Sequence, residues 1–437
     1  MHGRHQIHVA DLDKGDVFVA AGLLGQEDLI DGRRVDPDSH AGLDGALVRI
    51  AQEDDVLPDV GFAAQAQHLF DVQPIVGGIA EGKSRQHDKI ELAAGQGSQP
   101  VQRAAGIEQV QSHAGLVERF VQAGGKIADT TDERTGVPVY SLYGPTRRPT
   151  PEMLKNVDVL VYDIQDVGAR FYTYISTMGE CMEAAADKGI PFIVLDRPNP
   201  LADTAVEGRM IDLERFKSFV GAYAIPIRYG LTIGELAGIV RDGMKKDVKL
   251  TVVKMKNYRR SLWYDETGLP WIAPSPNLPS LASATVYPGM CLFEGTNLSE
   301  GRGTMQPFET VGAPWLDAYK LVEELTALKL EGVLFRPVSF TPTSSKHQGQ
   351  LCQGIQLHVT DRQRLRSVKV ALHVLSLIRK NHPAQFQWRD SSIDRLSGSD
   401  ELRLSLDKGL SVDRILASWD ADLKKFDGMR KKHFLYQ

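Results

Sequence analysis

The chain has 437 residues, which is enough for two or three domains that each bury a core. Its net charge of -5 gives no basic footprint for nucleic acid, and no apolar run approaches the roughly 20 residues that a membrane helix needs. The three cysteines, Cys181, Cys291 and Cys352, are far apart and form no CxxC pair. They are therefore interpreted as buried thiols, and neither a disulfide framework nor a zinc site is expected.

The first 125 residues differ in composition from the rest of the chain. They contain no Thr, Asn, Tyr, Trp or Cys, yet they hold more than half of the histidines. The segment is either a genuine but unusual domain or a stretch translated from a wrong frame, strand or start. The second interpretation is favoured because the local signals disagree with each other, and it predicts a disordered or loosely helical segment. Only Asp16 to Leu24 could form a strand or a short helix. The N-terminus shows no signal peptide.

After residue 125 the pattern becomes that of an α/β fold. Apolar runs and helical spacing predict a strand, a single helical turn, a strand buried on both faces, a helix and a second buried strand, at 137–142, 151–156, 157–164, 175–188 and 190–195. Strand, helix and strand at this length form one parallel βαβ unit. A sheet of this kind therefore begins the ordered part of the chain.

The pattern continues with shorter elements. A strand is predicted at 225–229, and then a helix at 233–244 that opens on a capping box of Thr232 and Glu235. A strand at 250–255 and a long loop at 258–283 follow. Near Thr285 a smaller domain is expected, with helices at 315–328 and 363–379 and strands at 333–340 and 354–359. A further helix is expected within the tail at 412–434. The predicted division is an anomalous segment at 1–125, a parallel-sheet domain at 126–284 and a second α/β subdomain at 285–437.

Polar side chains follow the two buried strands. Asp163, Asp166, Arg170 and Tyr172 come after the first strand, and Asn199 follows the second. In open α/β sheets, ligands bind at the carboxyl ends of the strands. The alternatives are helix caps for the aspartates, a structural turn for the asparagine and a core position for the tyrosine.

A second group lies in the loop Leu292–Thr304, where glycines separate Glu294, Asn297, Glu300 and Arg302. Two carboxylates suit acid/base work on a glycosidic bond. The alternative is a tight loop with internal salt bridges. The sequence has no P-loop, no GxGxxG after a strand, no HExxH and no GxSxG, so neither a nucleotide nor a metal is indicated.

From about Gly125 onward the chain resembles the bacterial exo-β-N-acetylmuramidases of the NamZ type. The runs that carry this resemblance are TGVPVYSLYG, RRPTPEML, VDVLVYDIQDVGARFYTYISTM, DRPNP, PSPNLPS, FEGTNLSEGRGT and KHQGQLCQG. The resemblance implies a Rossmann-like domain joined to a smaller α/β subdomain, with the site in the cleft between them. It also implies release of N-acetylmuramic acid from the non-reducing end of peptidoglycan-derived muropeptides or disaccharides, without a metal or nucleotide. Export from the cell is implied as well.

One departure from the family concerns its Pro-Glu-His-Gly segment, whose glutamate is the leading catalytic candidate. This chain has ERFVQAGG at the corresponding place, Glu118–Gly125. The first strands of the sheet are expected to be missing too. The hypothesis is that the chain lacks an essential acid/base group and is inactive or unstable.

The remaining candidates are assigned as follows. Glu294 and Glu300 are predicted for acid or base roles. The residues predicted to contact the substrate are Asp163, Asp166, Arg170, Tyr172, Asn199, Asn297 and Arg302. Two alternatives stay open, namely a muropeptide-binding protein without catalysis and a hydrolase of the same fold with a different ligand.

Overall fold

The computed structural model describes residues 16–20, 48–49, 128–132 and 135–437. Most of the interpretation of residues 1–125, including the ERFVQAGG run, lies outside these residues. The chain divides into two compact units that interleave along the sequence. Unit 1 consists of Met1–Ile164, Thr177–Asp196 and Met244–Asn257, and unit 2 consists of Gln165–Ser176, Arg197–Gly243 and Tyr258–Gln437. The predicted division at residues 284 and 285 stays a prediction.

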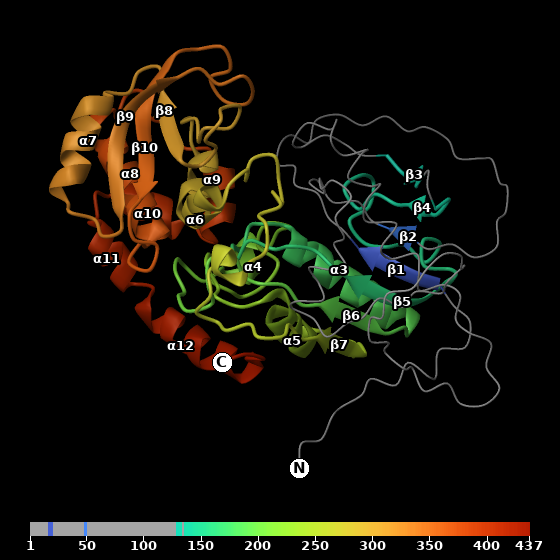
Figure 1. Ribbon diagram of the computed structural model, residues 1–437. Helices are drawn as coiled ribbons and strands as arrows, with labels where there is room; N and C mark the ends of the chain where they lie inside the picture. The colour runs from blue at the N-terminus through green and yellow to red at the C-terminus, as the bar shows by residue number, and fades with distance from the viewer. Residues whose placement is uncertain (1–15, 21–47, 50–127, 133–134) are drawn as a thin grey trace, which may run out of the picture. The chain divides into compact units, whose positions relative to one another are not determined.

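Unit 1 is built on a seven-stranded sheet (Figure 1). Its order is β3 (Thr130–Thr131), β4 (Pro138–Val139), β2 (Val48–Arg49), β1 (Asp16–Ala20), β5 (Val157–Tyr162), β6 (Phe192–Leu195) and β7 (Leu250–Val253). Every pairing is parallel except that of β3 with β4. The predicted parallel α/β sheet is therefore confirmed, although β5 ends at Tyr162 rather than at residue 164.

Two strands of this sheet come from the first 125 residues. β1 lies between β2 and β5 and pairs in parallel with both. The expectation that the early strands of the sheet are missing is therefore wrong for these two segments. The physical reason is visible in β1 itself, DVFVA, whose valines and phenylalanine favour an extended strand.

The predicted βαβ unit is present. Helix α3 (Tyr174–Lys188) connects β5 to β6, which pair in parallel. The helix stops where expected because Gly189 adopts a φ of +78°, a conformation that favours glycine, and its amide donates to the Ala185 carbonyl at 2.8 Å.

Unit 2 contains an antiparallel sheet in the order β8 (Thr310–Ala313), β10 (Cys352–Val359), β9 (Val333–Phe340). Helix α7 (Ala318–Ala327) packs against β9 and β10, and α8 (Ser367–Asn381) packs against α7 (Figure 1). The other helical elements of this unit are α4 (Leu213–Phe216), α5 (Ile233–Gly243), η1 (Tyr264–Thr267), α6 (Leu281–Met290), η2 (Cys291–Gly295), α9 (Asp390–Ser397), α10 (Glu401–Asp407), α11 (Val412–Ala417), α12 (Asp420–Arg430) and η3 (Lys431–His433).

Several predictions for unit 2 are confirmed and others are wrong. The capping box of α5 is formed, because the Thr232 amide donates to Glu235 Oε2 at 3.0 Å and the Glu235 amide donates to Thr232 Oγ1 at 3.3 Å. Residues 225–229 form no strand and make only isolated bridges at Arg228. The further helix predicted within 412–434 is confirmed, and this range holds α11, α12 and η3. Helix α6 was not predicted because Pro288 lies inside it.

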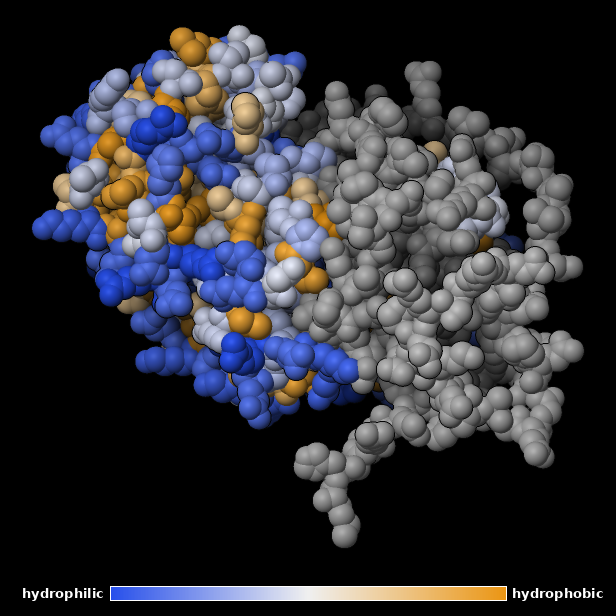
Figure 2. Space-filling view, viewed as in Figure 1, coloured by the Kyte–Doolittle hydropathy of each residue, from blue (hydrophilic) through white to orange (hydrophobic). Residues whose placement is uncertain are grey.

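The coloured residues on the face shown in Figure 2 are mostly hydrophilic, with hydrophobic residues gathered in patches between them. No helix in the described part of the chain combines the length and the apolar character needed to cross a membrane. The three cysteines are free and buried, as interpreted from the sequence.

The close approach of α6 to α8 leads to a stability prediction. A Cβ added at Gly289 would lie 1.9 Å from the Ser367 carbonyl oxygen, which belongs to the backbone and cannot turn away. We expect Gly289→Ala to lower the free energy of unfolding by about 2 kcal/mol or more, because the two helices must separate. Urea denaturation measures this change. Gly428→Ala, in α12 with nothing within 4 Å, is the matched control. It should be neutral or stabilising by up to about 1 kcal/mol, and an equal loss in both variants would contradict the prediction.

Candidate active site

A row of alternating charges forms the centre of the site in unit 2. Arg302 Nη2 lies 2.7 Å from Glu294 Oε1, and Arg302 Nε lies 3.3 Å from Glu300 Oε1. On its other side Glu300 pairs with Lys346, whose Nζ lies 2.8 Å from Oε2. The loop carboxylates predicted from the sequence are therefore brought together by one arginine, and a lysine from a distant segment joins them.

The protonation of Glu300 follows from these partners. Its side chain is 1% exposed, and burial raises its pKa, but Lys346 and Arg302 outweigh burial and hold the pKa below its usual range. Burial lowers the pKa of Arg302, but Glu294 and Glu300 raise it by more than burial lowers it. The net effect is a raised pKa, so the guanidinium stays charged. Glu300 is therefore an ionised anchor and is poorly suited to donate a proton.

The backbone holds this row in place. Gly301 and Gly303 adopt φ values of +81° and +75°, and a Cβ at Gly303 would meet the Ser344 amide nitrogen at 2.5 Å. Lys346 Nζ also donates to the carbonyl oxygens of Phe293 at 2.8 Å and Thr296 at 3.1 Å. The lysine thus fastens the loop through its backbone as well as through Glu300.

Backbone strain concentrates around the same row. Phe308, Ser345 and His347 have φ values of 62°, 65° and 58°, and they are three of the six non-glycine residues with positive φ in the described part of the chain. Each such residue costs about 1–3 kcal/mol, and this strain is typical of binding and catalytic sites. The two residues on either side of Lys346 are therefore held in a costly conformation that orients the lysine.

Aromatic contacts join this loop to the segment that follows β5. Tyr287 of α6 makes edge-to-face contacts with Phe171, Tyr172 and Phe308, at centroid distances of 5.3, 6.1 and 4.8 Å. The guanidinium of Arg302 lies 5.3 Å from the Phe308 ring. The two groups of candidate residues are thus parts of one packed cluster.

Asp166 is the buried carboxyl of that segment. Its Oδ2 accepts hydrogen bonds from the Gly168 amide at 2.7 Å and from the Tyr229 hydroxyl. Burial raises the pKa of Asp166 to about 6, although the hydrogen bonds from Tyr229, Gly168 and Val167 lower it. The acceptor atoms Asp166 Oδ1 and Gln165 Oε1 are buried and without a hydrogen-bond partner of ordinary geometry among the described residues. A carboxyl that titrates near neutral pH beside unused acceptors suits a hydrogen bond to a ligand.

The two asparagines are placed as backbone ties. Asn199 Nδ2 donates to the Leu231 carbonyl at 3.0 Å, and its Oδ1 accepts from the Leu201 amide at 3.0 Å. Asn297 Nδ2 donates to the Gln385 carbonyl at 2.8 Å, and its Oδ1 accepts from the Gln387 amide at 3.0 Å. The contacts of Asn199 are therefore those of a structural turn, which is the alternative given for it from the sequence.

The contacts of Arg170 are made with backbone carbonyls. Its side chain is fully buried, and its guanidinium donates to the carbonyls of Arg209 at 2.7 Å, Ile225 at 2.9 Å and Leu396 at 2.8 Å. Burial lowers its pKa to about 9. Because these bonds tie three remote segments together, the structure places Arg170 as a scaffold residue, and its contact with the substrate stays a prediction.

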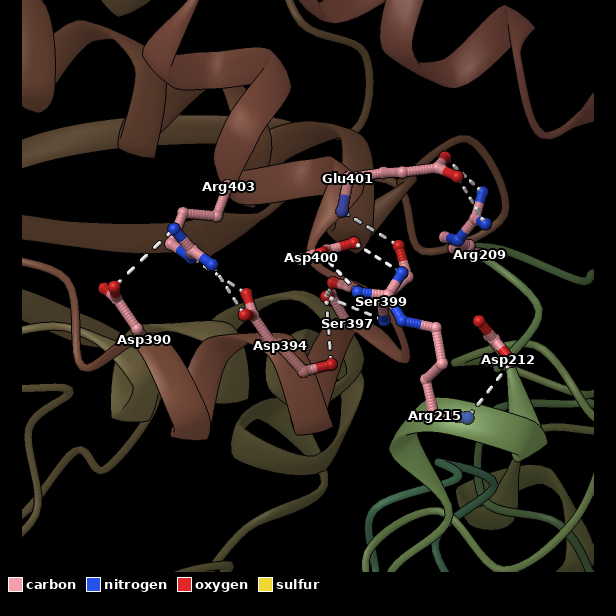
Figure 3. Close-up of polar contacts among 10 residues, drawn as sticks. All are labelled: Arg209, Asp212, Arg215, Asp390, Asp394, Ser397, Ser399, Asp400, Glu401 and Arg403. Carbon is pink, nitrogen blue, oxygen red and sulfur yellow. Dashed lines mark hydrogen bonds and ion pairs between the residues drawn. The ribbon is translucent and has the colours of Figure 1, made fainter.

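A surface seam of ion pairs strengthens two of the segments that Arg170 ties (Figure 3). Arg209 pairs with Glu401 at 2.7 Å and Arg215 with Asp400 at 2.7 Å, which fixes α4 and its approach to α10. Both pairs are partly exposed, so each contributes little by itself. Their effect is to hold residues 209–215 against the end of α9, where the Leu396 carbonyl meets Arg170.

The contacts of Tyr172 are those of a core side chain. Tyr172 is fully buried, its hydroxyl donates to the Pro274 carbonyl at 2.5 Å, and Tyr174 packs edge-to-face against it at 4.7 Å. This is the core position that the sequence left open as an alternative. Asp163 is half-buried at the end of β5 in unit 1, whereas Asp166 belongs to unit 2.

Three important residues were not singled out from the sequence, namely Lys346, Tyr287 and Tyr229. Lys346 lies in the KHQGQLCQG run, but nothing local indicates its contact with residue 300. Tyr287 lies in α6, a helix that the sequence does not predict because Pro288 lies inside it. Tyr229 lies in the predicted strand at 225–229, which does not form. In the described part of the chain, no group of His, Cys, Asp and Glu is arranged to hold a metal ion.

Comparisons with family models and with a curated protein identify the same family. Residues 111–282 match the family described as exo-beta-N-acetylmuramidase NamZ, N-terminal, and residues 285–436 match the corresponding C-terminal family. The match thus begins before residue 125, where the resemblance was expected to start. A curated relative, peptidoglycan beta-N-acetylmuramidase NamZ of Bacillus subtilis (strain 168), is 52% identical over 316 residues, which cover 72% of this chain and 76% of the relative.

Two crystal structures of DUF1343 family proteins from Bacteroides fragilis share the fold. BF0371 has a TM-score of 0.68 at 40% identity and covers 70% of this chain and 82% of its own. BF0379 has a TM-score of 0.58 at 34% identity and covers 73% of this chain and 84% of its own.

The pairing of Lys346 with Glu300 leads to a prediction about stability and pH. Lys346→Met leaves a buried carboxylate with one cation fewer, so we expect a loss of about 3 kcal/mol or more at pH 7. The lowered pKa means that the pair stabilises the fold above the ordinary glutamate pKa of 4.5 and that this contribution disappears as the pH falls through the folded value. The loss should therefore shrink at acidic pH, which denaturant unfolding at several pH values measures.

Two further variants sharpen this experiment. Adding Glu300→Gln to Lys346→Met should recover part of the lost stability, because the stranded charge is gone. Lys155→Met removes a lysine that is 70% exposed in its side chain and pairs only with Glu152 at 3.9 Å, so it should cost less than about 0.5 kcal/mol. A loss in Lys346→Met that does not change with pH would contradict the prediction.

Proposed function

We propose, because the chain belongs to the exo-β-N-acetylmuramidase NamZ family, that it is a glycosidase that releases N-acetylmuramic acid from the non-reducing end of peptidoglycan fragments. The observation that supports this most is the match to both halves of the family, over residues 111–282 and 285–436. The 52% identity with a peptidoglycan β-N-acetylmuramidase extends over 316 residues, or 72% of this chain. The charged row of Glu294, Arg302 and Glu300 lies within the matched part.

Of the two loop carboxylates, Glu294 is proposed for the chemical step. Hydrolysis of a glycosidic bond needs a proton for the leaving oxygen and a carboxylate that activates water or attacks carbon. Glu300 is enclosed between Lys346 and Arg302, whereas Glu294 is paired with Arg302 alone among the ion pairs described and is 9% exposed. We assign Glu294 to the base or nucleophile role, and Glu300 to positioning Arg302. Asp166 is proposed to accept or share a hydrogen bond with the sugar.

A second candidate is binding of muropeptides without turnover. It is favoured by one observation, the ERFVQAGG run at Glu118–Gly125 in place of the Pro-Glu-His-Gly segment of the family. Residues 118–125 lie outside the described part of the chain, so this hypothesis depends on the sequence alone. A third reading, a hydrolase of the same fold with another ligand, differs only in the sugar that it accepts.

The assay for this proposal uses fluorogenic glycosides of N-acetylmuramic acid and N-acetylglucosamine. We expect release from the muramic acid glycoside only, and we expect Glu294→Gln to lower kcat by about 100-fold or more because a group acting on the reacting atoms is neutralised. Glu331→Gln changes a glutamate that is 72% exposed in its side chain and should leave kcat unchanged.

Calorimetric titration with a muramic-acid-containing disaccharide separates the rivals. Binding without release of sugar would favour the non-catalytic candidate. Release from the glucosamine glycoside instead would favour a different ligand. Full activity of Glu294→Gln would move the chemical step to another residue.

A further inference from the structure

We propose that the segment Tyr229–Thr232 is a positioning element, through which Arg260 and Arg430 hold the Tyr229 hydroxyl on the Asp166 carboxyl. The inference rests on the proposed function for the role of Asp166 at the substrate. The contacts that carry it all lie within unit 2. They place the site on one side of this short segment and the two arginines on the other.

On the site side, the segment supplies two groups. The Tyr229 hydroxyl donates to Asp166 Oδ2, and the Leu231 carbonyl accepts from Asn199 Nδ2 at 3.0 Å. Asn199 in turn lies against Gly168, where an added Cβ would meet Asn199 Oδ1 at 2.5 Å. The Gly168 amide is the second donor to Asp166, so the segment acts on that carboxyl directly and through its neighbour.

On the other side, the Gly230 carbonyl accepts hydrogen bonds from both arginines. Arg260 Nη2 donates to it at 2.7 Å, and Arg430 Nη1 donates to it as well. Gly230 has a φ of +57°, and a Cβ there would lie 2.4 Å from Arg430 Nη1 and 2.6 Å from the Ala205 carbonyl oxygen. Only glycine fits, because two guanidinium groups reach one backbone carbonyl.

This arrangement brings like charges together in a buried place. Burial lowers the pKa of Arg430, and Arg260 lowers it further. The cost is offset by Glu235, which pairs with Arg260, by Asp427, which lies 2.8 Å from Arg430 Nη2, and by the Phe434 ring, whose centroid lies 3.5 Å from the Arg260 guanidinium carbon. Both arginines also donate to the Asp203 carbonyl, at 3.2 Å from Arg260 Nη2 and at 3.0 Å from Arg430 Nη1. Two charges gathered at such cost on the carbonyls of Gly230 and Asp203 fix the position of Gly230, and Tyr229 is the residue next to it.

The position of Tyr229 matters because its hydroxyl is one of the few groups that lower the pKa of Asp166. The groups that lower the pKa of its carboxyl are the Tyr229 hydroxyl and the backbone of Gly168 and Val167, against the larger effect of burial. No charged side chain of the described residues is among them. The tyrosine hydroxyl is therefore the side-chain group that stabilises the ionised form of this aspartate.

The test follows the titration of Asp166 directly, by carbon NMR of the full chain labelled at aspartate carboxyl groups. The resonances are assigned by their loss in Asp166→Asn and in Asp203→Asn, because burial also raises the pKa of Asp203 to about 7. We expect Tyr229→Phe to raise the pKa of Asp166 by about one unit, since a hydrogen bond to the charged form is lost. Arg430→Met should raise it in the same direction.

Controls keep this test independent of folding and of activity. Arg215→Met removes an arginine that is 59% exposed in its side chain and should leave the Asp166 titration unchanged, and Tyr319→Phe should do the same. Arg430→Lys, which keeps the charge but loses the planar fork, serves if Arg430→Met does not fold, and it should also raise the pKa. Folding of each variant is checked by thermal unfolding.

The outcomes are distinct. An unchanged Asp166 pKa in folded Tyr229→Phe, or in the folded arginine variant, would overturn the proposal. If the chain turns over muramic acid glycosides, the limb of the pH profile that belongs to Asp166 should move by the same amount as the NMR titration. If it shows no turnover, the proposed function fails, while the NMR titration still decides whether Arg430 acts through Tyr229.

Discussion

The enclosed charge of Glu300 is the constraint on which the site depends. A carboxylate that is 1% exposed persists only where cations and donors surround it. Here Lys346 and Arg302 provide the cations, and Arg302 extends the row to Glu294. The loop must therefore turn sharply enough to bring residues 294, 300 and 302 to one point, which explains the positive φ at Gly301 and Gly303.

The same requirement recurs through unit 2. Arg170 ties the carbonyls of three remote segments, and Arg228 pairs with Glu207 at 2.9 Å while both are buried. Glu235 pairs with Arg260 and also caps its own helix. Breaking such a pair leaves a buried charge alone, so these residues specify how the long loops of unit 2 pack, where regular secondary structure is sparse.

These scaffold contacts change the roles that the residue types alone suggest for several candidate residues. The sequence predicts substrate contacts for Arg170, Tyr172, Asn199 and Asn297 because they follow the buried strands or lie in the glycine-rich loop. Their contacts are with backbone carbonyls and amides, and they hold the segments that carry the acidic groups. The groups that we propose for the chemistry are Glu294 beside Arg302 and the Asp166 carboxyl beside Tyr229.

The sequence by itself determined the elements whose signals are local. The apolar run of β5, the capping box of α5 and the glycine after α3 each depend on residues within a few positions, and the structure has them where they were predicted. The long motifs also determined the family. Local pattern failed at residues 225–229, where an apolar run is taken up by loop contacts instead of a ladder, and at α6, where Pro288 conceals a helix.

Only the tertiary structure decided which charged and polar residues meet. Residues 300 and 346, 260 and 430, and 166 and 229 are far apart in the sequence, and the pairs depend on how long loops fold back. From the sequence alone, an arginine such as Arg170 that binds a sugar cannot be distinguished from one that binds a backbone carbonyl. The residue type gives its hydrogen-bond donors but not its burial. The physical reason is that ionisation and availability depend on desolvation and on neighbours, and both are properties of the packed chain.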